Sequence, residues 1–126
     1  MPYLNWIKEP DLNFLPFAIA DRSSAPPIGV YVLFVVGSLD CQTVKVGFGD
    51  VATEIAADRI NQEILDFRQR GKLQVTWAQT TREQMTGIAR HLSNLLQPRI
   101  IMAGLSDLPP IEANVPGSPV ILKPSR

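Results

Sequence analysis

One apolar run constrains the fold of this chain more than any other feature. Residues 28–36 read Ile-Gly-Val-Tyr-Val-Leu-Phe-Val-Val, and they lie between the pair Pro26-Pro27 and Gly37. A short run dominated by β-branched and aromatic residues is typical of a strand that is buried on both faces. The sequence therefore predicts such a strand at 28–36.

A second strand is predicted directly after a turn. Residues 37–40, Gly-Ser-Leu-Asp, form the turn, so residues 42–48 pair with the first strand as an antiparallel hairpin. Side chains of the second strand alternate in character. We expect one face to carry Val44 and Val46, and the other to carry Thr43, Lys45 and Gly47.

A helix is predicted from Asp50 to about Arg70. Asp50 is an N-cap residue by type, and Gly71 follows the last turn as a C-cap. Apolar residues recur at helical spacing and predict a buried stripe, which comprises Ala56, Ile60, Ile64 and Phe67.

A third strand and a second helix complete the pattern. Residues 72–80 alternate, with Trp77 on the side predicted to pack in the core. Residues 80–83, Thr-Thr-Arg-Glu, read as a capping box that starts a helix, which ends before Pro98. The fold class is thus α/β (α+β), with a small three-stranded antiparallel sheet flanked by helices in the order ββαβα.

The 126 residues fit one domain with two irregular ends. Residues 1–27 contain several prolines between aromatic residues and are expected to form an extended arm that packs on the core. Residues 28–98 form the core domain. Residues 99–126 are a proline-rich tail, in which Val120–Leu122 could add an edge strand.

Charge and cysteine content exclude some kinds of protein. Twelve basic and twelve acidic residues give a formal net charge of 0, which argues against a strongly basic nucleic-acid binder but allows a local basic patch. The single cysteine, Cys41, excludes an internal disulfide and is expected to be a small turn residue. No apolar leader or membrane-length run is present, so we expect a cytoplasmic location and no membrane partner.

Four sequence features stand in a suggestive order. Gly29-Val30-Tyr31 lies in the first strand, Lys45-Val46-Gly47 in the second, and Arg59 on the first helix, while the second helix ends in Leu95-Leu96-Gln97-Pro98. Together, residues 28–98 resemble the GIY-YIG nuclease superfamily. The resemblance implies cleavage of phosphodiester bonds. In that family a tyrosine helps to activate water, a helix arginine stabilises the phosphate, and a glutamate on the second helix binds one divalent metal.

The family positions map onto this chain with two departures. Tyr31 and Arg59 match the family tyrosine and arginine, but Lys45 replaces the second-motif tyrosine. Ala89 falls where the metal-binding glutamate should be, and it has no ligand atom. The resemblance therefore implies catalytic positions at Tyr31, Lys45 and Arg59 with doubtful activity. It implies no metal cofactor, unless an active enzyme were to use Mg²⁺ or Mn²⁺.

Each candidate also has a structural interpretation. Tyr31 could be a core aromatic with its hydroxyl near the surface, and Lys45 a solvent-facing strand residue. Lys45 could instead lower the pKa of Tyr31 or bind a phosphate. Arg59 could pair with Glu63 one helical turn later. Arg68, Arg70 and Lys72 form a candidate phosphate-binding patch, although the negative end of the helix dipole also explains them.

These observations leave three functions open. The first, which we favour, is a degenerate GIY-YIG-like domain that binds nucleic acid (DNA) or protein without cutting. The second is an active endonuclease with a displaced metal ligand. The third is an unrelated interaction domain that binds a protein partner, or a second copy of itself, through its arm and tail. We expect Tyr31, Lys45 and Arg59 to meet around one pocket in either of the first two cases.

Overall fold

The fold is built around a four-stranded sheet. The computed structural model describes residues 3–7, 15–17, 25–38, 40–100, 102 and 109–116. The strands are β1 (Leu15–Pro16), β2 (Gly29–Val36), β3 (Cys41–Gly49) and β4 (Lys72–Gln79), in the spatial order β1-β4-β2-β3. These four strands pair with one another antiparallel, and β1 adds only two residues to the three-stranded sheet predicted from sequence. The predicted fold class is confirmed.

Strand β2 is the central strand of this sheet. It pairs with β3 along one edge and with β4 along the other, and every residue from Gly29 to Val35 is buried. A strand with neighbours on both sides and layers on both faces has no solvated surface, which explains its continuous apolar sequence. The prediction for 28–36 is confirmed.

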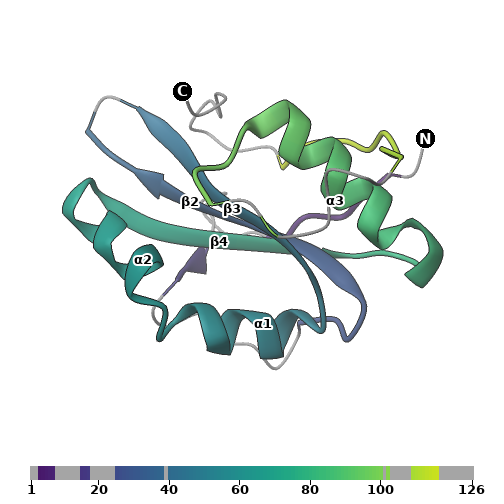
Figure 1. Cartoon of the computed structure of the whole chain (residues 1–126), viewed down its shortest axis with the longest axis horizontal. Coiled ribbons are helices and arrows are strands. Elements are labelled where there is room, and N and C mark those ends of the chain that lie inside the picture. Colours follow the sequence, from purple (N-terminus) through teal and green to yellow (C-terminus); the bar gives the residue numbers. More distant parts are fainter. Residues whose placement is uncertain are drawn as a thin grey trace.

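Helices cover both faces of the sheet (Figure 1). Helix α3 (Arg82–Leu96) lies on one face, where Ile88 and Leu92 pack with Val32. Helices α1 (Val51–Asp58) and α2 (Gln62–Leu65) lie on the other face. The core there includes Phe17, Tyr31, Leu33, Ile55, Ile64 and Trp77, so the prediction that Trp77 packs in the core is confirmed.

A register shift alters the predicted faces of β3. Leu33 pairs with Lys45 and Phe34 with Thr43, so Val44 is an extra residue, as in a β-bulge. Val44 packs in the α1 side of the core, whereas Val46 packs in the α3 side. The expectation that these two valines share a face was therefore wrong, because strict alternation fails at a bulge.

The single long helix predicted for 50–70 was also wrong. Helix α1 begins after its N-cap Asp50, as predicted, but ends at Asp58. The chain turns at 59–60, Asn61 caps α2 by accepting from the backbone N–H of Glu63 at 2.9 Å, and a 3-10 helix (Asp66–Gln69) follows. A side-chain cap inside the predicted helix restarts it in a new direction.

The break follows from two competing stripes of side chains. Val51, Ile55 and Asp58 form one stripe of α1, and all three are buried. The predicted stripe, Ala56, Ile60, Ile64 and Phe67, would lie on the opposite side of a continuous helix. Because the helix breaks, Ile64 enters the core fully buried, while Ile60 is left 84% exposed.

Helix α3 matches its prediction except for the cap. Its N-cap is Thr81, whose hydroxyl accepts from the backbone N–H of Gln84. The predicted capping box, 80–83, begins at Thr80, so the observed cap lies one residue later. Glu83 is an exposed acid in the first turn, where it favours the helix dipole. The helix ends at Leu96, and Gln97 adopts a left-handed conformation before Pro98.

Described parts of both ends of the chain contact the core. Leu4 is buried on the α3 side and Phe17 on the α1 side. The backbone N–H of Leu4 donates to the Asn114 side chain at 2.6 Å, and Trp6 Nε1 donates to the Asn114 carbonyl at 3.0 Å. Segments 3–7 and 109–116 are therefore tied to each other. The expected edge strand Val120–Leu122 lies outside the described residues.

The position of Cys41 differs from its prediction. Cys41 is not a turn residue but the first residue of β3, where its side chain is buried on the α3 side. Burial, and next the charge of Asp40, raise the pKa of its thiol to about 11, which makes the thiol unreactive near neutral pH. Within the described segments, no helix is long and apolar enough to cross a membrane.

The helix break can be tested with a matched pair of isoleucines. Ile64→Ala should lower the free energy of unfolding by about 2–5 kcal/mol, because it removes a fully buried side chain. Ile60→Ala should change it by less than about 0.5 kcal/mol, because Ile60 is exposed. Urea denaturation measures both. Equal losses in the two variants would mean that the helix is continuous and buries the predicted stripe.

Candidate functional site

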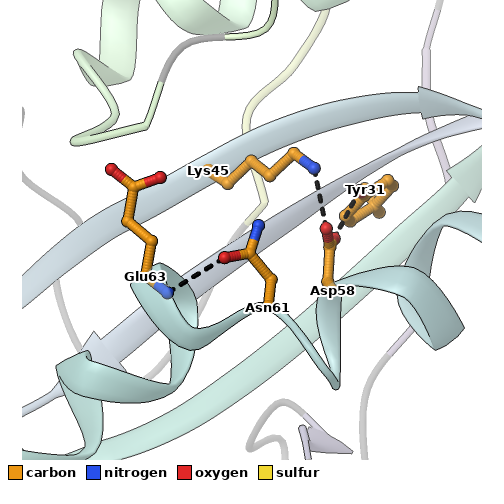
Figure 2. A network of polar contacts seen from close by, with 5 residues as sticks. All are labelled: Tyr31, Lys45, Asp58, Asn61 and Glu63. Atoms are coloured by element: carbon orange, nitrogen blue, oxygen red, sulfur yellow. Dashed lines mark hydrogen bonds and ion pairs between the residues drawn. The ribbon is translucent and has the colours of Figure 1, made fainter.

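A buried carboxylate joins two of the three predicted site residues. The Tyr31 hydroxyl donates to Asp58 Oδ2 at 2.5 Å, and Lys45 Nζ lies 2.7 Å from Asp58 Oδ1. Figure 2 shows the phenol and the ammonium converging on the same carboxyl group. We call Tyr31, Lys45 and Asp58 the buried triad. Its members come from β2, β3 and α1, so it links three separate elements.

The hairpin register brings Tyr31 and Lys45 onto one face of the sheet. Gly47 is the direct cross-strand partner of Tyr31, and Lys45 is the next residue of β3 on the same face. A Cβ on Gly47 would overlap the phenol ring, which means that the ring lies directly over this glycine. Lys45 Nζ is 5.8 Å from the ring centroid. Glycine at 47 is therefore a steric requirement of tyrosine at 31.

Each member of the buried triad needs the other members, because the triad lies away from water. The Asp58 side chain is 4% exposed and that of Lys45 is 12% exposed, so both charges are largely removed from water. A buried charge is tolerated only when a counter-charge and hydrogen bonds replace its hydration. Lys45 supplies the counter-charge for Asp58, and Tyr31 supplies a charge-assisted hydrogen bond.

The electrostatics keep the proton on Tyr31. Burial raises the pKa of this phenol far above its ordinary value, and the negative charge of Asp58, the hydrogen bond to Asp58 and the charge of Glu54 raise it further. The sequence-based expectation that Lys45 would lower the pKa of Tyr31 was wrong, because burial and the Asp58 carboxylate raise that pKa and the ammonium pairs with Asp58. A phenol in this state donates a hydrogen bond but does not remove a proton from water.

Arg59, the third predicted site residue, contacts a different group. Its Nε donates to the backbone carbonyl of Phe17 at 3.0 Å, and its guanidinium lies 5.9 Å from the centroid of the Phe17 ring. The predicted pairing with Glu63 assumed a continuous helix, which instead ends at Asp58. The structure therefore brings Tyr31 and Lys45 together at Asp58, and directs Arg59 to Phe17.

Arg59 instead borders a cavity of about 520 Å³ beside α2 and the start of β4. Phe17, Leu65 and Leu73 supply apolar lining, and Arg59, Arg68 and Lys72 supply three cations. The lining is completed by Pro16 and Gly71. We call this hollow the cationic groove. No carboxylate is among the described residues that line it.

The cationic groove contains two of the three residues of the predicted phosphate patch. Arg68 and Lys72 are exposed at the groove. Arg70 is not part of the lining, because its guanidinium lies over the Phe67 ring and donates to Gln42 Oε1 at 3.3 Å. Arg59, which was predicted to be catalytic, takes the third position instead.

Ala89 lies on the other face of the sheet from the buried triad. It is fully buried on the α3 side with Val30 and Ile88, whereas Tyr31 is buried on the α1 side. A glutamate at position 89 would thus start from the wrong side of β2 to reach the Tyr31 hydroxyl. Across the described ranges, no three His, Cys, Asp or Glu side chains gather as a metal site would require.

Asp58 is the site residue that sequence reasoning missed. A signal for it was present, because Asp58 follows Val51 by seven residues and Ile55 by three, which places it on their face of a helix. A carboxylate on an apolar face needs a cationic partner. Lys45, on the preceding strand, was the candidate.

The chain matches no protein-family model, no curated protein and no solved structure. Its site therefore has to be interpreted from its own geometry. The structure agrees with the expected GIY-YIG-like fold only in having a small antiparallel sheet with helices, in the order ββαβα when the broken first helix is taken as one segment.

Removal of the Tyr31 hydroxyl tests the energetics of the triad. Tyr31→Phe should lower the free energy of unfolding by about 1.5–3 kcal/mol at pH 7, as expected for a lost hydrogen bond to a charged group. The folded-state pKa of Tyr31 is raised, so the stability it contributes is complete below about pH 10 and falls as the pH rises beyond that value.

Urea titrations between pH 7 and 11 measure both effects. The alkaline loss of stability should be shallower in Tyr31→Phe than in the wild type, while Tyr3→Phe, which alters a side chain that is 76% exposed, serves as the matched control. Identical pH profiles for Tyr31→Phe and the wild type would contradict the hydrogen bond to Asp58.

Proposed function

We propose that this chain is a GIY-YIG-like domain that binds nucleic acid and does not hydrolyse it. The observation that carries the proposal is the engagement of Tyr31 and Lys45 by Asp58. These two positions correspond to the family's phenols, and both polar groups are committed to an internal carboxylate instead of facing a substrate.

The GIY-YIG-like part of the proposal is supported by element order and by the two motif glycines. The described elements after β1 run ββαβα when α1, α2 and the following 3-10 helix are taken as one helical segment. Gly47 lies beneath the Tyr31 ring, and a Cβ on Gly29 would come within 2.5 Å of the Ala78 carbonyl oxygen. Both motifs thus have glycine where close packing around β2 demands it.

The non-hydrolytic part is supported by the chemistry of the triad. Hydrolysis of a phosphodiester requires an activated water and stabilised negative charge at one place. The protonated phenol of Tyr31 cannot activate water, and Arg59 is hydrogen-bonded at Phe17. The phenol of Tyr31 and the guanidinium of Arg59 are thus bound to different internal groups and do not act together on a phosphodiester.

Binding to nucleic acid is supported by the cationic groove. Arg68 and Lys72 are exposed cations that line one hollow beside Arg59, on a chain whose formal net charge is 0. Clustered basic side chains bind phosphates by releasing counterions, which needs a local patch and not a basic protein.

The absence of hydrolysis is tested with duplex, branched and single-stranded DNA in Mg²⁺ and in Mn²⁺. We expect intact DNA on denaturing gels at every protein concentration, beside an authentic nuclease as positive control. DNA cleavage that disappears in Tyr31→Phe would contradict the proposal and would favour an active endonuclease.

The binding itself is tested through its salt dependence. The apparent association constant for DNA should fall as salt rises, and Lys72→Gln should reduce the magnitude of the log–log slope by about 0.7–0.9, as for one lost phosphate contact. Arg82→Gln removes the same charge from an exposed residue outside the groove and should leave the slope unchanged. Lack of DNA affinity at low salt would reject the proposal.

A further inference from the structure

We infer that the cationic groove takes an unstacked base of a single-stranded nucleic acid, with the neighbouring phosphates on Arg68 and Lys72. This inference rests on the proposed function and adds the form of nucleic acid that the site selects. It stands on the apolar lining of the groove, the placement of its cations and its size.

The apolar lining of the groove would contribute nothing to binding a phosphate group alone. Leu65 and Leu73 are half-buried side chains at the groove, and the buried Phe17 forms part of its wall. A polyanion that needed only charge would bind equally well to a flat basic surface. A hollow with apolar walls instead gains free energy when it covers a flat, weakly hydrated group such as a nucleobase.

The cations line the same hollow as the apolar walls, so they can bind the phosphates next to a bound base. Arg68 lies in the 3-10 helix (Asp66–Gln69), where its Nε donates to the Leu65 carbonyl at 3.0 Å, and Lys72 is the first residue of β4. Both are exposed and line the same hollow. Arg59 is only half-exposed, and its guanidinium lies 5.9 Å from the centroid of the Phe17 ring, which forms part of the wall.

The size of the hollow separates single strands from duplexes. A volume of about 520 Å³ falls within the range of roughly 300–1,000 Å³ that is typical of small-molecule pockets, so it admits one nucleotide but not a double helix. Duplex bases are stacked and paired, so they reach such a pocket only at the cost of unpairing. A duplex can therefore use the cations but not the apolar walls.

The experiment compares ligands with equal charge and different bases. The full chain is titrated into fluorescein-labelled oligothymidylate of roughly 10 nucleotides, within common site sizes of about 4–16. Parallel titrations use an abasic oligomer with the same phosphates, a duplex of the same length and polyglutamate of equal charge. We expect the oligothymidylate to bind at least about fivefold more tightly than the abasic oligomer, the lower end of one stacked base.

A matched pair of leucines locates the contact. Leu65→Ser should bring the affinity for oligothymidylate down to that for the abasic oligomer, with the salt dependence unchanged, because the cations remain. Leu95→Ser, at a leucine of α3 that is 47% exposed and lies outside the groove, should have no effect. Circular dichroism establishes that both variants are folded, and the comparison of ligands on the wild type does not depend on either variant.

The outcomes distinguish the two proposals. Equal affinity for oligothymidylate, abasic oligomer and duplex would overturn the inference and leave nucleic-acid binding intact. Polyglutamate that binds as tightly as oligothymidylate would overturn it by reducing the groove to a charge site. If no oligonucleotide binds at low salt, the proposed function fails and the inference fails with it.

Discussion

The structure depends on the Asp58 carboxylate, which is buried where a helix meets a sheet. Without it, the Tyr31 hydroxyl and the Lys45 ammonium would face a low-dielectric interior with no partner, at a cost of several kcal/mol. With it, β2, β3 and α1 are joined through one side chain. The glycine at 47 leaves room for the Tyr31 ring, and Asp58 is the last residue of α1, so both features accommodate this contact.

Two adjacent residues, Asp58 and Arg59, lie in different surroundings. Asp58 ends α1 inside the core, and Arg59 begins the turn that leads to the cationic groove. Asp58 is therefore committed to an internal contact, whereas the next residue borders a hollow at the surface. The proposed function assigns binding to that hollow and not to the buried triad, because function belongs to sites and not to folds.

The sequence was sufficient for the three main strands and the last helix, because β2 is a continuous apolar run and α3 has a periodic apolar stripe. It was not sufficient where two signals competed. The apolar stripe through Ile60 outweighed the stripe that contains Asp58, since a carboxylate counts against burial until its partner is known. The motifs identified Tyr31 and Lys45 as a pair. The positions of Asp58 at the end of α1 and of Arg59 at the groove were missed, because they depend on the helix break before the N-cap Asn61.

The ionisation of Tyr31 reports directly on its hydrogen bond to the buried Asp58. In a Tyr3→Phe background, Tyr31 is the single tyrosine, and absorbance at about 295 nm follows its phenolate. We predict that no phenolate forms while near-UV circular dichroism remains native, and that ionisation coincides with alkaline unfolding. Titration of Tyr31 within the native fold near pH 10 or below would contradict it, because a phenol hydrogen-bonded to buried Asp58 cannot give up its proton so easily.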